Sequence, residues 1–149
     1  MKVFIGADYR GFDAKNALLD FLRSQNYDVV DEGAFEKVEG DDFNDPAIRV
    51  ATNVQKEPGA FGILICDSAH GMTMQANRLK GIRAAHCGSV ESALLAREHD
   101  DANILCLSAH FLAPDEMNSI ADKFLTQKFE PLERRVRRIK RLDEETKND

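Results

Sequence analysis

The 149-residue chain lacks tryptophan and has only two tyrosines, four prolines and three cysteines. Because Cys66, Cys87 and Cys106 are odd in number and widely spaced, they exclude a disulfide framework and favour a reducing compartment. Long apolar runs are absent as well. The first residues are too briefly hydrophobic for a secretory signal, and no stretch approaches the ~18 residues of a membrane span. We therefore expect a cytoplasmic protein that does not enter a membrane.

The chain also lacks a positive net charge. Its formal net charge is −6, and this argues against a general nucleic-acid binder. The exception is a basic block near the C-terminus, made of Arg134, Arg135, Arg137, Arg138, Lys140 and Arg141. With 43% hydrophobic residues and no Pro/Gly/Ser-rich linker, the chain suits one domain with a substantial core. We expect a single domain over residues 1–149, of which 142–149 form a frayed polar tail.

Short apolar runs alternate with segments of helical spacing along the whole chain. The runs predict strands at 3–5, 27–30, 61–65, 82–87 and 104–107. Between and after them, helices are expected at 14–22, 45–56, 72–78 and 89–99, then from Pro114 and after Pro131, with Asp45 as a helix cap. Residues 33–44 form an acidic loop. This alternation predicts a parallel sheet with helices on both faces.

In such sheets, ligands bind at the carboxyl ends of the strands, near a switch in strand order. Asp8, Cys66 and Ser108 all stand at predicted strand ends. Cys66 also precedes a predicted helix, whose amide N–H groups favour an anion, so we expect a lowered thiol pKa. Such a thiolate can act as nucleophile, metal ligand or general base. For Cys87 and Cys106, we expect burial in the core.

Several familiar cysteine sites do not match this segment. A phosphate-loop phosphatase requires an arginine six positions after its cysteine, and Met72 stands there. A metal site pairing Cys66 with a histidine lacks any tight ligand spacing. The Gly6–Gly11 segment is neither a dinucleotide-binding turn nor a Walker loop. A thiol hydrolase that uses Cys66 with His70 remains open.

Four motifs together resemble the type B ribose-5-phosphate isomerases, a family that also contains the galactose-6-phosphate isomerase subunits. They are GADYRGFDAK from Gly6, GILIC with Gly71 and Met72, ANRLKGIRAA from Ala76, and AREHDDANILCL from Ala96. The resemblance implies a Rossmann-like three-layer α/β sandwich with a five-stranded parallel sheet and an additional C-terminal helix. It also implies a homodimer with its site at the interface, with a dimer of dimers left open.

For activity, the resemblance implies reversible aldose–ketose isomerisation of a phosphorylated sugar without metal or cofactor. Ribose 5-phosphate is the first expected substrate. A four- or six-carbon sugar phosphate is the alternative, as is a relative that binds sugar phosphates without turnover.

The resemblance also assigns roles to individual residues. Cys66 matches the general base, and Ser68 with the backbone N–H groups of Ala69 to Gly71 matches an anion hole. Asp8 matches a residue that binds sugar hydroxyls. His99, beside Asp100, matches the residue that opens the furanose ring, and in the family it reaches the pocket from the partner subunit.

The chain departs from the family pattern at Tyr9, Asp67, His70 and His110, and Asp67 should oppose ionisation of the thiol. In the final helix, the match ERRVRRI favours Arg135 as the phosphate contact, whereas an ungapped alignment selects Arg137. His110 and Arg10 are weaker candidates. The expected substrate-binding set is Asp8, Tyr9, Asp67, Ala69, His70, Gly71, Asp100, His110, Arg135 and Arg137.

Overall fold

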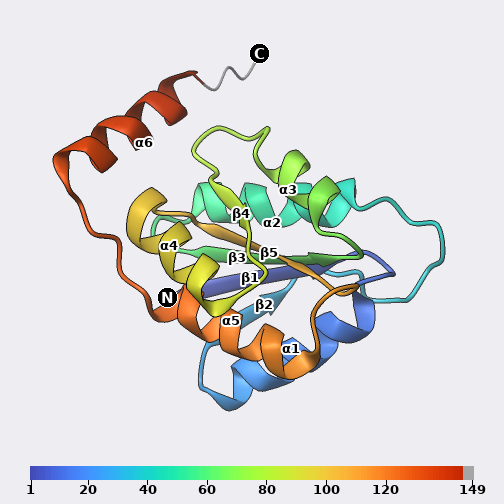
Figure 1. The fold of residues 1–149 in the computed structure, drawn as a ribbon. Helices are drawn as coiled ribbons and strands as arrows, with labels where there is room; N and C mark the ends of the chain where they lie inside the picture. Colours follow the sequence, from blue (N-terminus) through green and yellow to red (C-terminus); the bar gives the residue numbers. More distant parts are fainter. Residues whose placement is uncertain (146–149) are drawn as a thin grey trace.

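The computed structural model describes residues 1–145 as one α/β layered fold (Figure 1). Its strands are β1 (Lys2–Ala7), β2 (Asp28–Asp31), β3 (Phe61–Cys66), β4 (Ala84–His86) and β5 (Ile104–Ser108). Its helices are α1 (Phe12–Ser24), α2 (Asn44–Lys56), α3 (His70–Ala76), α4 (Val90–Asp100), α5 (Pro114–Thr126) and α6 (Glu133–Glu145). Every element expected from the periodicity is present.

The five strands form one parallel sheet in the order β2-β1-β3-β5-β4. Side chains alternate between its faces, so Ile63 and Ile65 join one apolar cluster while Leu64 and Cys66 join the other. The first cluster includes residues of α1, α4 and α5, and the second includes residues of α2 and α3. Both faces of the sheet are therefore covered, which confirms the predicted fold class.

Element boundaries differ from the expectations in two informative places. Helix α2 begins at Asn44 with Phe43 as its N-cap, so the expectation that Asp45 caps this helix is wrong; Asp45 lies inside the first turn. Strand β4 is an edge strand of three residues, shorter than the apolar run that predicted it. Cys87 and Cys106 are fully buried, as expected. Burial raises the pKa of Cys106 to about 12, so this thiol stays protonated.

Helix α6 stands away from the sheet and packs mainly against α4 (Figure 1). It has no buried residue, and two members of its apolar stripe, Val136 and Leu142, are about half exposed. The helix includes residues 142–145, which we expected in a frayed tail; residues 146–149 of that tail lie outside the described residues. Within residues 1–145, no helix is both long and apolar enough to cross a membrane.

Candidate active site

The carboxyl ends of β1, β3 and β5 meet at one edge of the sheet. The register pairs Ala7 with Ile65 and Cys66 with Ser108, so the residues after these strands lie together. The strand order also reverses here, because β1 continues to β2 on one side while β3 lies on its other side. This is the switch point at which such sheets bind ligands. Asp8, Cys66 and Ser108 lie at the carboxyl ends of these strands, as the sequence predicted.

The loop after β3 is tied to the loop after β5 by several hydrogen bonds. Ser108 Oγ donates to the Asp67 carbonyl over 2.6 Å, and the His110 N–H donates to the same oxygen over 3.1 Å. Ala69 has a left-handed backbone with φ of 72°. That turn directs the N–H groups of Ala69 and Met72 toward the sulfur of Cys66. Ser68 Oγ accepts from the His70 N–H over 3.4 Å.

Cys66 lies at the end of β3 and is only 5% exposed. Burial raises the pKa of its thiol, the N–H groups of Met72 and Ala69 lower it, and the charges of Asp8 and Asp67 raise it further. The net shift is upward, so the sequence expectation of a lowered pKa is wrong. The helix end does favour the thiolate, but desolvation costs the charged form more. The expected opposition from Asp67 is present.

Two residues of the acidic loop, Asp41 and Phe43, complete this edge. Asp41 Oδ1 accepts the Tyr9 N–H over 3.0 Å. The Phe43 ring covers Gly71 so closely that a Cβ built there would lie 2.6 Å from the ring. Sequence reasoning missed both residues, because nothing in the residues of an acidic loop indicates which part of the fold it will contact.

Asp8 directly follows β1 at this edge and is 8% exposed. It accepts the Gly11 N–H over 3.0 Å. Burial raises its pKa, the Gly11 N–H lowers it, and the charges of Asp41 and Asp67 raise it. A carboxylate accepts hydrogen bonds from hydroxyl groups but repels a phosphate, so Asp8 suits a ligand hydroxyl.

Three histidines surround the same edge. His110 Nδ1 lies 3.6 Å from Asp67 Oδ1, and the His70 and His86 rings pack edge to face with centroids 5.5 Å apart. Burial lowers the pKa of His86, and the nearby His70 lowers it further. Tyr9, also at this edge, has the Arg10 guanidinium 5.1 Å from its ring centroid. His70 and His110 are therefore both within the region expected from sequence.

His99 and Asp100 lie at the opposite edge of the sheet, since α4 ends there and β5 begins. They line a cavity of about 300 Å³ together with Arg134, Arg135 and Arg138 of α6. The four residue steps of β5 alone span about 13 Å. Within one chain, His99 and Cys66 therefore lie at opposite edges of the sheet, as the order of the elements in the sequence predicted.

The arginines of α6 differ in their partners. Arg135 is paired with Glu130 at 2.9 Å and also bonds to the Glu98 carbonyl, and Arg137 is paired with Glu133 at 3.5 Å. Arg134 and Arg138 have no ion pair within residues 1–145. Arg135, which the sequence favoured, thus lines the cavity beside His99 but is ion-paired, whereas Arg134 and Arg138 line it without an ion pair among the described residues.

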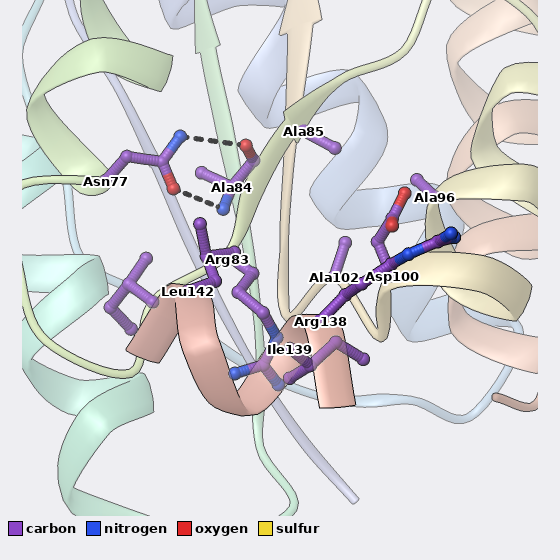
Figure 2. A pocket seen from close by; sticks show the side chains of 11 residues that line it. Asn77, Arg83, Ala84, Ala85, Ala96, Asp100, Ala102, Arg138, Ile139 and Leu142 are labelled. Carbon is purple, nitrogen blue, oxygen red and sulfur yellow. Dashed lines mark hydrogen bonds between the residues drawn. The ribbon is translucent and has the colours of Figure 1, made fainter. Parts of the chain in front are cut away.

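A larger cavity of about 570 Å³ lies between α6 and the edge strand β4 (Figure 2). Ile139 and Leu142 form its side on α6, opposite small residues of β4, α4 and the turn before β5: Ala84, Ala85, Ala96 and Ala102. Arg138 and Asp100 belong to both cavities. Among residues 1–145, Val136 and Leu142 of the α6 apolar stripe remain about half exposed.

A family model described as Ribose/Galactose Isomerase matches residues 3–142. The chain belongs to this family. Among its relatives, a probable ribose-5-phosphate isomerase B of Mycoplasma pneumoniae is 41% identical over 128 residues, which cover 86% of this chain and 84% of the relative. The ribose-5-phosphate isomerase B of Mycobacterium tuberculosis (strain H37Rv) is 33% identical over 97% of this chain and 89% of its own.

Solved structures of the family share the fold. Ribose-5-phosphate isomerase B of Mycoplasma genitalium, crystallised with bound ribulose-5-phosphate, is 39% identical, with a TM-score of 0.92 over 96% of this chain and 94% of that chain. The enzyme of Thermotoga maritima is 36% identical with the same TM-score, over 96% of this chain and 97% of that chain. The resemblance seen in the sequence is confirmed.

Proposed function

We propose that the protein is an aldose–ketose isomerase that interconverts ribose 5-phosphate and ribulose 5-phosphate without a cofactor. The observation that carries the proposal is Cys66 at the switch point of the sheet, with the N–H groups of Ala69 and Met72 directed at its sulfur and the charge of Asp8 acting on it. Support comes from the relative of 39% identity that was crystallised with bound ribulose-5-phosphate.

The chemistry moves one proton between neighbouring carbons. In this proposal, the Cys66 thiolate takes the proton from C2 of the open-chain aldose, and the electrons of that C–H bond form the enediolate. The Ser68 hydroxyl and the Gly71 N–H stabilise the oxygen on which charge develops, while the Ala69 N–H is directed at the Cys66 sulfur. The resulting thiol returns the proton to C1, while the hydroxyl proton at O2 is transferred to O1. Asp8 accepts hydrogen bonds from sugar hydroxyls and orients the chain.

Ring opening requires a second group, since ribose 5-phosphate is mostly a closed furanose. In the proposal, His99 gives a proton to the ring oxygen as the C1–O bond breaks. Within one subunit, His99 and Cys66 lie at opposite edges of the sheet. We therefore infer a homodimer in which His99 of the second subunit completes each site. The half-exposed apolar stripe of α6 is the kind of surface that a second subunit covers.

The raised thiol pKa has a consequence for pH dependence. Because the thiolate is the active form, kcat/KM should rise with pH, and its ascending limb should lie above the ordinary thiol value of 9.0. Asp67→Asn removes a negative charge that raises this pKa, so its limb should move to lower pH. Asp28→Asn, at the exposed start of β2, is the control and should leave the profile unchanged. An unshifted limb in Asp67→Asn would remove the proposed coupling.

For the phosphate, we propose Arg134 and Arg138, the arginines beside His99 that have no ion pair within the described chain. Arg138→Ala should raise KM for ribose 5-phosphate roughly ten- to a hundredfold, or ~1.5–3 kcal/mol, because a charge-assisted contact is lost. Arg141→Ala is the matched control: this residue lies on the same helix but is paired with Glu145 at 3.0 Å. Turnover of unphosphorylated ribose should not change. Equal losses on both sugars would contradict the phosphate role.

The function itself is tested by assaying ketose formation from aldose phosphates of four, five and six carbons. We expect the highest kcat/KM on ribose 5-phosphate, with solvent deuterium incorporated at sugar C2 during the reverse reaction. Binding without exchange would indicate a relative that has lost turnover. A trapped acyl-thioester on Cys66 would indicate a thiol hydrolase instead.

A further inference from the structure

Lys15 is a fully buried cation that the chemistry above does not use. It lies on α1 with an exposure of 0%, and its Nζ is 2.9 and 3.1 Å from the two carboxylate oxygens of Asp31. The same ammonium donates to the Ala34 carbonyl. The Phe12 and Phe35 rings lie over it, with centroids 5.4 and 5.6 Å away. All three contacts beyond α1 are therefore with β2 and the residues that follow it.

These contacts hold the start of the loop between β2 and α2, which the structure places at residues 32–43, against the end of β1. Asp31 Oδ1 accepts the Gly33 N–H over 2.9 Å. The N–H of Ala7, the residue immediately before Asp8, donates to the Gly33 carbonyl, and the Ala34 N–H donates to the Ala7 carbonyl, each over 2.7 Å. The part of the loop that contacts Lys15 therefore lies directly beside the candidate active site.

From this anchor the loop extends along the carboxyl edge to α3. Asp41 accepts the Tyr9 N–H, and the Phe43 ring covers Gly71. Just beyond it, the Asn44 side chain donates to Gln75 of α3 over 2.8 Å. The loop therefore contacts both sides of the site, the turn after β1 and the helix after β3.

Resting on the proposed function, we propose that Lys15 is a positioning residue for isomerisation. By holding Asp31 and Ala34, it fixes the 32–43 loop so that Asp41 and Phe43 stay against Tyr9 and Gly71. Two apolar side chains in the same space would make the fold equally or more stable. The attraction within a buried ion pair does little more than offset the free energy lost when both charges leave water. The pair does provide directional contacts, which an apolar pair lacks, and these specify where the loop runs.

The experiment separates positioning from stability with two variants. Lys15→Met leaves the Asp31 charge unpaired and should lower Tm by about 10 °C. Lys15→Met with Asp31→Asn removes both charges, keeps an acceptor for the Gly33 N–H, and should recover most of that loss. Both variants should nevertheless lose kcat/KM by between about tenfold and a hundredfold. Neither variant restores the Lys15 contacts, so Asp41 and Phe43 remain displaced from Tyr9 and Gly71. Hydrogen exchange should accelerate in residues 35–43.

Lys37→Met is the matched control, since Lys37 belongs to the same loop but forms an exposed pair with Asp13 at 2.7 Å. It should change neither Tm nor kcat/KM. A double variant that recovers activity together with Tm would overturn the positioning role, as would unchanged exchange in residues 35–43. A wild-type protein without isomerase activity would contradict the proposed function. In that case, the role of Lys15 would be supported if its variants showed faster hydrogen exchange in residues 35–43 and a higher Kd for ribulose 5-phosphate, and contradicted if neither changed.

Discussion

Replacing Cys66 with alanine should lower isomerase turnover by ~10²–10⁴-fold, the contribution expected of a general base. Cys66→Ser should fail as well, because a hydroxyl is a far weaker acid than even a thiol of raised pKa and forms almost no anion. Both side chains fit the space of the thiol, so the fold and its far-UV circular dichroism should persist. The measurement is kcat for ketose formation at saturating ribose 5-phosphate.

Cys87→Ala is the matched control for this experiment. Cys87 is also buried but belongs to the apolar cluster on the other face of the sheet from Cys66. Its loss should cost some stability and leave turnover within about twofold, since a core methyl-sized change acts on packing. If either Cys66 variant retained more than about a hundredth of wild-type turnover, the general base would have to be another group.

Mixed dimers of two inactive variants should regain about a quarter of wild-type activity. Cys66→Ala and His99→Ala homodimers should each be inactive on the cyclic substrate. When the two chains are unfolded and refolded together, half of the dimers are mixed. Each mixed dimer has one site with both lesions and one site with neither. The expected recovery follows directly from this pairing if His99 acts on the site of its partner.

The control replaces the His99→Ala chain with one that carries both substitutions. Mixed dimers of Cys66→Ala with this double variant contain no intact Cys66 and should remain inactive. A sample shown by mass spectrometry to contain mixed dimers, yet without recovered activity, would assign Cys66 and His99 to the same subunit's site. That result would also contradict the inferred dimer arrangement.

Much of the fold was accessible from the order of residues because it depends on local patterns. The alternation of apolar runs and helical spacing predicted all five strands and six helices. The rule that parallel strands share a carboxyl edge then predicted that Asp8, Cys66 and Ser108 lie together. The same reasoning placed His99 at the opposite edge, since it precedes a strand. These inferences need only the period of the side chains and the direction of the chain.

Packing decided the rest. The sequence favoured a lowered pKa for Cys66 from its place before a helix, but the net shift depends on desolvation by residues far away in the chain. Likewise, spacing alone could not tell that Arg135 is paired with Glu130 while Arg138 is left beside His99.

The sequence by itself therefore determined the elements of this protein, their parallel arrangement and the edge that holds its reactive groups. Only the tertiary structure decided the strand order, the contacts of Asp41 and Phe43 with the site, and the use of Lys15 to hold their loop. The physical reason is the range of the interactions. Periodicity acts within a few residues of the chain, whereas burial, ion pairing and loop placement depend on surfaces that meet only after the sheet has formed.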